Sequence, residues 1–285
     1  MIPHMNIVAW SNVAPWASFR QVEQDLMISR AVIDIFNDDF LREELRFRGG
    51  TALNKLHFPK PLRYSEDIDL VRTSAGPIKA LLGQICDVLR PWLGEATFRD
   101  SPVAPTLTYR AGAEDGGPQL RLKVEINTRE REAYDGAVLK PLEIENPWFT
   151  GQVDIPTFTN EEILATKLRA LLERNKGRDL FDLAHAFDVF DGLDTDRVVT
   201  LFAQYMDAQG KRLTRAQAEQ RMLNKLAHAD LLADVRPLLA PDAAAALTDD
   251  NMNASFMDVF TRFIARFPGA PWALAEERLT HYGLG

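Results

Sequence analysis

The sequence predicts a mixed α/β N-terminal half followed by an all-helical C-terminal half. The segment from Leu120 to Asn127 alternates apolar and polar residues, which is the pattern of a strand with one buried face. From Thr159 onward apolar residues recur at helical spacing, and Thr159 to Glu162 has the form of a helix-capping box. A chain of 285 residues is long enough for two modest domains, and we expect them to cover residues 1–156 and 157–285.

The N-terminal half is expected to alternate helices with short strands. Gly49 and Gly50 are expected to end the first long helix, because glycine readily adopts the backbone conformation that closes a helix. Pro59 and Pro61 break the short helix that follows, since proline lacks the N–H of a helix interior. In chain order we expect helices at 17–45 and 51–56, a strand at 65–71, a helix at 77–93, and strands at 106–110 and 120–127. A proline-containing stretch, residues 141–156, ends this half.

The C-terminal half carries amphipathic helical patterns and no internal repeat. No strand pattern interrupts these segments, so this half is expected to be a helical domain. The expected helices cover residues 163–174, 179–190, 195–208, 214–229, 231–239 and 254–266.

Composition and charge exclude several classes of protein. With 46% hydrophobic and 26% charged residues, the chain has the composition of an ordinary globular protein, and no apolar run approaches the roughly 20 residues that span a bilayer. The single cysteine, Cys86, cannot form an internal disulfide and fits a reducing cytoplasm. A net charge of −8 argues against broad, non-specific nucleic-acid binding, although a local basic surface can still bind RNA. We therefore expect a cytoplasmic protein without a membrane partner.

Two carboxylates are expected to share one face of the strand at 65–71. Asp67 and Asp69 are two residues apart, so both project to the same side while Ile68 projects to the other. Two neighbouring carboxylates repel each other unless a cation lies between them, and Mg²⁺ prefers such oxygen ligands. Taken alone, this spacing is more often a pair of solvated charges at a strand edge.

A glycine-rich turn upstream of these acids favours a phosphate-binding role. Gly49, Gly50 and Thr51 lie between two helical segments, where glycines let a bulky anion approach the backbone closely. Ser65 precedes the acids on the same strand face, and its hydroxyl could donate to a phosphate oxygen. The turn lacks the Gly-Lys-Ser/Thr of a P-loop, so ATP hydrolysis of that type is not indicated.

Glu125 could complete a cluster of three acids. It lies on the polar face of the alternating strand at 120–127, together with Arg121 and Lys123. Three acidic residues that hold one or two metal ions would support in-line displacement at a phosphorus atom. The alternative is that Glu125 merely pairs with Arg121 or Lys123.

These segments resemble the AbiEii/AbiGii group of nucleotidyltransferase toxins, which includes MenT-like toxins, within the polymerase-β-like superfamily. The resemblance rests on Phe47 to Leu53, Arg63 to Leu70 and Lys123 to Asn127, and extends over roughly residues 20–190. It implies a polymerase-β-like nucleotidyltransferase core with a small mixed sheet in residues 1–156. It also implies that the helical domain, residues 157–285, completes the active-site cleft.

The helical half contains a further element of this resemblance. The group carries a lysine followed by an Arg-Asp-x-x-Asp stretch, which here corresponds to Lys167 and to Arg178, Asp179 and Asp182. Lys167 lies within the apolar arc of its helix, where a lysine either extends past the core edge or points its charge into a cleft. The resemblance implies that Lys167 neutralises the triphosphate and that Asp179 is an active-site acid. The alternative for Asp179 and Asp182 is ordinary capping in the first turn of a helix.

The resemblance implies a toxin that transfers a nucleoside monophosphate from an NTP to RNA, most simply the 3′ end of tRNA, and that is neutralised by a cognate antitoxin. Such an enzyme needs Mg²⁺ and releases pyrophosphate. One alternative keeps the chemistry but uses a small molecule or a protein side chain as acceptor, and another is a non-catalytic nucleotide- or partner-binding module. Candidate RNA contacts are Lys55, Lys60, Arg63, Arg174 and Arg178, although each is individually more often a solvated surface charge.

Overall fold

The computed structural model describes residues 1–227 and 233–284, which form two compact units, Met1–Thr159 and Asn160–Gly285. The boundary at residue 159 lies three residues beyond the expected position. The difference arises because strand β7 (Phe149–Thr157) runs past residue 156 and pairs along its whole length.

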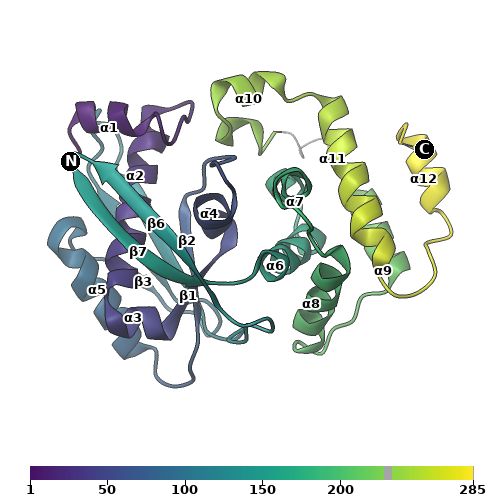
Figure 1. The fold of residues 1–285 in the computed structure, drawn as a ribbon, viewed down its shortest axis with the longest axis horizontal. Coiled ribbons are helices and arrows are strands. Elements are labelled where there is room, and N and C mark those ends of the chain that lie inside the picture. The colour runs from purple at the N-terminus through teal and green to yellow at the C-terminus, as the bar shows by residue number, and fades with distance from the viewer. Residues whose placement is uncertain (228–232, 285) are drawn as a thin grey trace. The chain divides into compact units, whose positions relative to one another are not determined.

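A five-stranded mixed sheet forms the centre of the first unit (Figure 1). Its strand order is β1-β2-β5-β4-β3, and only the central pair β2–β5 is parallel. The strands are β1 (Leu45–Arg48), β2 (Asp67–Arg72), β3 (Thr97–Arg99), β4 (Thr106–Ala111) and β5 (Leu120–Asn127). This small mixed sheet confirms the predicted fold class of the N-terminal half.

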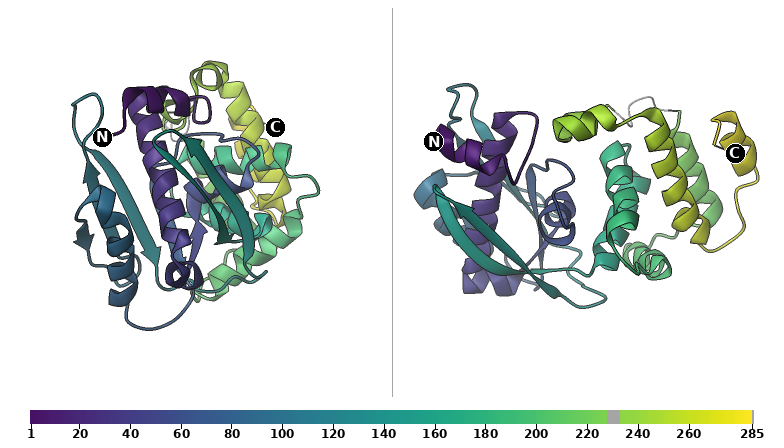
Figure 2. Two further views of the ribbon diagram at one scale, coloured as in Figure 1. Left: turned by 60° about the vertical axis from the view of Figure 1, so that its left-hand side comes forward. Right: turned by 45° about the horizontal axis from the view of Figure 1, so that its top comes forward.

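Helix α2 (Phe19–Asn37) packs against the sheet and is the longest helix of the described residues (Figure 2). The Ser18 side chain caps its first turn by accepting a hydrogen bond from the backbone N–H of Arg20. Helix α2 contacts β5 and β7 as well as α1 (His4–Trp10), α3 (Asp39–Glu44) and α5 (Lys79–Leu93). The core of the unit therefore lies between α2 and the apolar face of the sheet.

The hairpin of β6 (Val138–Asn146) and β7 was not expected from the sequence, which places only a proline-containing stretch there. Pro141 and Pro156 lie within its two strands. A two-stranded ribbon has open edges, so a proline can occupy it without removing a hydrogen bond from a central ladder. The Asn146 side chain accepts a hydrogen bond from the backbone N–H of Trp148 and so fixes the turn.

Strand β1 was also missed, because the expected helix over 17–45 covers its beginning. The structure divides that segment into α2 and α3, and the next four residues form β1, with Leu45 and Phe47 fully buried. After Arg48, a short helix α4 (Gly49–Ala52) continues into a π-helical turn, η1 (Leu53–His57). Four alternating residues are too few to be separated from the helical periodicity that precedes them.

The second unit is helical throughout its described residues, which confirms the predicted class of the C-terminal half. Helix α7 packs against α6 and α11, and α6 also contacts α8 and α9. The principal helices are α6 (Asn160–Glu173), α7 (Gly177–Val189), α8 (Thr195–Asp207), α9 (Arg215–Lys225) and α11 (Asp249–Arg262). Two further short helices, α10 (Pro241–Ala246) and α12 (Ala275–His281), were not expected.

Part of the expected helices at 214–229 and 231–239 falls on residues 228–232, which lie outside the described residues. Within the described part, α9 ends at Lys225, and Arg236–Leu238 forms a single 3-10 turn, η2. None of the helices that the structure describes combines the length and the apolar character needed to cross a bilayer.

Candidate active site

Three carboxylates lie on the polar face of the parallel strand pair β2–β5. The strand register places Asp69 beside Glu125 and Asp67 beside Lys123. The alternate residues Ile68 and Val124 are fully buried on the opposite face. Because paired residues of neighbouring strands point to the same side of a sheet, the three predicted acids are brought to one surface of the first unit.

The charges on this surface are not balanced. Burial raises the pKa of Asp69, and the negative charges of Asp67 and Glu125 raise it further, to about 6, although Arg48 and Lys123 partly oppose the change. The Lys123 Nζ lies 2.9 Å from a Glu125 carboxylate oxygen and 3.8 Å from an Asp67 carboxylate oxygen. Lys123 therefore bridges two of the acids, which is the pairing that the sequence leaves open as the alternative for Glu125.

The donor set fits a divalent cation in its chemistry. Asp67, Asp69 and Glu125 supply hard oxygen ligands on one surface, and their mutual repulsion is visible in the raised pKa of Asp69. Among residues 1–227 and 233–284, no three His, Cys, Asp or Glu side chains already surround a common point. A bound cation would therefore have to displace the ammonium group of Lys123 from between Asp67 and Glu125. Metal ligation by these acids stays a prediction.

The glycine turn is joined directly to the beginning of β2. The Thr51 hydroxyl, which is 1% exposed, donates to the Asp67 carbonyl oxygen and hydrogen-bonds the Ser65 hydroxyl at 2.9 Å. Gly49 has a φ of 82°, a conformation that favours glycine, and a Cβ atom there would lie 2.1 Å from an Asp69 carboxylate oxygen. The structure thus brings Gly49, Thr51 and Ser65 together with the acids, as the sequence predicts.

Two of the candidate RNA contacts in this unit are buried instead. Arg63 is only 2% exposed, donates to the Tyr64 carbonyl oxygen at 3.0 Å, and lies against Gly50. Lys55 forms an ion pair of 2.9 Å with Asp25, in which both side chains are at most 10% exposed. Neither cation therefore presents its charge to an RNA backbone at the surface of this unit. Arg63 packs against the glycine turn and Lys55 joins η1 to α2 through Asp25, while Lys60 remains an exposed candidate.

A polar pocket of about 520 Å³ opens beside Asp67 within the first unit. Its wall combines two arginines, three glutamines, one aromatic ring and two acids, with a single aliphatic residue. The lining residues are Arg20, Gln21, Gln24, Tyr64, Glu66, Asp67, Gln119, Leu120 and Arg121. The sequence does not reveal this pocket, because its wall comes from three separate segments.

In the second unit, Lys167 is buried between two carboxylates. Its Nζ lies 3.3 Å from Asp179 and 2.9 Å from Asp182, and both carboxylates are completely buried. Lys167 itself is 6% exposed, so it neither extends past the core edge nor shows an exposed charge. The structure therefore brings together the lysine and the two acids that the sequence singled out, and the role of Lys167 in neutralising phosphates stays a prediction.

Two further cations surround this buried cluster. Arg174 forms a bidentate pair with Asp179 through Nε at 2.7 Å and Nη2 at 2.9 Å. Burial alone would raise the pKa of Asp179, but Lys167 and Arg174 lower it to about 2. Lys225 donates to the Arg174 carbonyl oxygen at 2.8 Å, and burial lowers its pKa to about 8. Sequence reasoning missed Lys225 because a lysine at the end of a helix is usually solvated.

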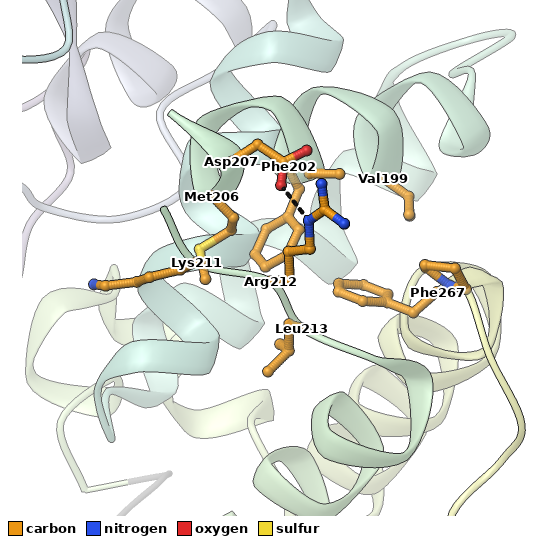
Figure 3. A pocket seen from close by; sticks show the side chains of 10 residues that line it. Val199, Phe202, Met206, Asp207, Lys211, Arg212, Leu213 and Phe267 are labelled. Atoms are coloured by element: carbon orange, nitrogen blue, oxygen red, sulfur yellow. Dashed lines mark hydrogen bonds and ion pairs between the residues drawn. The ribbon is translucent and has the colours of Figure 1, made fainter. Parts of the chain in front are cut away.

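A second pocket, of about 240 Å³, lies between α8 and the segment that follows it (Figure 3). Val199, Phe202, Met206 and other mostly apolar side chains line it, and an ion pair of 3.0 Å between Asp207 and Arg212 lies at its rim. It contains no pair of acids and no glycine turn. This pocket therefore lacks the features from which the sequence predicts phosphoryl chemistry.

Comparisons with known proteins agree with the geometry. A family model described as the AbiEii nucleotidyl transferase toxins of type IV toxin–antitoxin systems matches residues 30–266. The chain belongs to this family. The AbiEii family is one of nucleotidyltransferase toxins, so a nucleotide substrate and an antitoxin partner follow at that level.

The solved structure of MenT4 shows that the AbiEii chain shares its fold. MenT4, a nucleotidyltransferase toxin from Mycobacterium tuberculosis, is similar over 100% of this chain and 99% of its own, with a TM-score of 0.61 and 18% identity. JHP933 from Helicobacter pylori is similar over 93% of this chain and 97% of its own, with a TM-score of 0.48 and 17% identity. No curated protein matches the sequence.

A methyl group at Gly49 is expected to disable this AbiEii toxin. In Gly49→Ala the new Cβ would overlap the Asp69 carboxylate, and the φ of 82° would strain any residue with a side chain. Displacing an active-site group by about 1 Å can lower the rate about 100-fold, so we expect at least that loss in transfer assays. Gly83→Ala in α5 is the control, because nothing lies within 4 Å of its Cβ. Equal activity of the two variants would contradict this role for Gly49.

Proposed function

We propose that this AbiEii toxin uses Mg²⁺ to transfer a nucleoside monophosphate from an NTP to RNA, with the 3′ end of tRNA as acceptor and pyrophosphate as leaving group. The observation that carries the proposal is the surface on which Asp67, Asp69 and Glu125 converge beside the glycine turn. The chain belongs to the AbiEii family of nucleotidyltransferase toxins, and this membership gives the reaction class, nucleotidyl transfer. The acceptor, the metal ion and arrest of translation are the proposed part.

The chain's own residues would divide the work as follows. Gly49, Gly50 and Ser65 would receive the donor phosphates, because the glycine turn packs directly against Asp69 and the Arg63 guanidinium lies against Gly50. Asp67 and Asp69, with Glu125, would hold Mg²⁺, which supplies Lewis-acid stabilisation of the phosphates when bound.

The reaction would be an in-line displacement. The acceptor hydroxyl oxygen forms a bond to the α-phosphorus, the bond from that phosphorus to the bridging oxygen breaks, and pyrophosphate leaves with the electron pair. The hydroxyl proton would pass to one of the carboxylates on the β2–β5 face.

The direct test is incubation of the purified protein with total tRNA, Mg²⁺ and each labelled NTP in turn. We expect label in the RNA fraction with at least one NTP, and none with Asp67→Ala, because one of the three acids is then missing. Labelling of protein alone would overturn the RNA acceptor while keeping the enzyme class. Growth inhibition that survives Asp67→Ala in cells would overturn catalysis as the toxic activity.

A further inference from the structure

The polar pocket beside Asp67 extends beyond the residues that carry the proposed transfer chemistry. It lies where β2 and β5 begin, and residues of α2, of the segment before β2 and of the start of β5 form its wall. We propose that this pocket binds the terminal nucleoside of the RNA acceptor. The inference rests on the proposed transfer to RNA and assigns the acceptor subsite for it.

The position of the pocket relative to the glycine turn indicates that the pocket binds the acceptor RNA rather than the donor NTP. The sheet order is β1-β2-β5, and the turn at Gly49 follows β1, on one side of β2. The pocket is bounded by Gln119, Leu120 and Arg121 of the β5 side, on the other flank of Asp67. In-line displacement requires the attacking and leaving oxygens on opposite sides of the phosphorus. If the turn receives the donor's phosphates, the opposite flank receives the attacking hydroxyl.

The wall has groups that suit a nucleobase and its neighbouring phosphate. Gln21, Gln24 and Gln119 carry carboxamides, which present both a donor and an acceptor, as base edges do. Arg121 is exposed, and a guanidinium plane can stack on a base or contact a phosphate. A volume of about 520 Å³ lies within the range of small-ligand sites.

Contacts between the wall segments hold part of the pocket in place before a ligand binds. The Gln24 amide donates to the Arg121 carbonyl oxygen at 2.8 Å, so α2 is tied to the start of β5. Arg20 forms an ion pair of 2.6 Å with Asp115 in the loop that leads to β5. These contacts hold two of the wall segments against each other. Glu66 and Asp67 form the remaining side, where their negative charge would repel a free anion and favours a base or ribose instead.

Gln119 and Arg121 are the residues to change. Both are exposed, so replacing them should not disturb the packing of the core. The double variant Gln119→Ala/Arg121→Ala is compared with wild type for labelled transfer from the preferred NTP to total tRNA. We expect the KM for tRNA to rise by about 10-fold or more, while the KM for the NTP stays within about twofold, since loss of one base-stacking contact corresponds to a change of that order.

Arg110→Ala provides the matched control. Arg110 lies opposite Arg121 in the β4–β5 ladder and is exposed, but it does not line the pocket. The Arg110→Ala variant removes one positive charge close to the position of Arg121. It therefore distinguishes a weaker electrostatic attraction for RNA from the loss of side chains that line the pocket. Thermal unfolding of all variants checks that each is folded.

The outcomes separate the subsite from the function on which it rests. A rise in the KM for tRNA in the double variant alone supports the acceptor pocket. A rise in the KM for the NTP, no change in either constant, or an equal effect of Arg110→Ala would overturn it although transfer to RNA stands. Absence of any label in RNA with the wild-type protein would instead overturn the proposed function itself.

Discussion

Asp69→Asn is expected to raise the thermal stability of the metal-free protein at pH 7 and to abolish nucleotidyl transfer. In the folded protein, burial and the charges of Asp67 and Glu125 raise the pKa of Asp69 from 3.8 to about 6. The ionised carboxylate is therefore destabilising at pH 7. An asparagine has nearly the same shape but no charge, so it removes the repulsion together with the ligand oxygen.

The direction in which stability changes with pH follows from the pKa values of Asp69 in the folded and unfolded states. Because the folded value lies above the unfolded one, the wild-type protein loses stability as the pH rises from about 4 to about 6, and the full penalty applies above that. A shift of two units sets an upper bound of about 3 kcal/mol, and solvent screening reduces it to about 1–2 kcal/mol. In a protein of this size that corresponds to an increase of roughly 2–8 °C in Tm.

Thermal unfolding between pH 4 and pH 8 without divalent cations measures this difference. The difference in Tm should be largest above pH 6 and vanish near pH 4. Asp154→Asn, at an exposed position of β7, should not change Tm at any pH. Adding Mg²⁺ should raise the Tm of the wild-type protein and leave that of Asp69→Asn unchanged. A lower Tm for Asp69→Asn at every pH would mean that the carboxylate stabilises the fold and is not held there for function.

Strong local patterns predicted most of the fold, and short or interrupted patterns did not. The strand Leu120–Asn127 was predicted with its observed bounds, because eight alternating residues cannot be mistaken for a helix. The hairpin β6–β7 was missed because its prolines resemble loop signals, and a two-stranded ribbon tolerates them. β1 was missed because four residues are too few to establish a period.

The candidate site was predictable where its residues carry a spacing. Asp67 and Asp69 were identified by their alternation, and Glu125 by its place on a polar strand face. The sequence leaves Lys123 as one of two alternative partners of Glu125, and only the side-chain distances show that Lys123 lies between Asp67 and Glu125. The burial of Arg63 could not be predicted from the sequence either. Arg63 appears as a surface cation in the sequence, but long-range packing covers it.

Lys167→Met is expected to produce the largest loss of stability in the helical unit. The Lys167 ammonium lies between Asp179 and Asp182, and neither carboxylate is exposed to water. Methionine fills a similar volume but leaves buried negative charge without its main counter-charge, although Arg174 still pairs with Asp179. Breaking a buried ion pair on one side costs about 3–5 kcal/mol, so urea unfolding should report a decrease of that order.

A double variant distinguishes loss of the charge from loss of packing. In Lys167→Met/Asp182→Asn one of the two carboxylates is neutral, so most of the lost stability should return. If the double variant is as unstable as Lys167→Met, packing around the lysine stem explains the effect instead. Lys211→Met is the surface control; because its ammonium is half exposed and lies 3.8 Å from Glu173, its loss should cost less than about 1 kcal/mol.

The dependence of stability on acid gives an independent check of the same cluster. Lys167 and Arg174 lower the pKa of Asp179 to about 2 in the folded state, below its ordinary value of 3.8. The carboxylate therefore stabilises the wild-type fold above about pH 4, and this contribution is lost as the pH falls from about 4 to about 2. In Lys167→Met the folded pKa should rise towards the unfolded value, so the pH-dependent loss should become smaller and be complete at a higher pH. An unchanged acid-unfolding profile would show that Lys167 does not set the charge of Asp179, and with it the case for a coupled lysine–aspartate pair in this unit would fail.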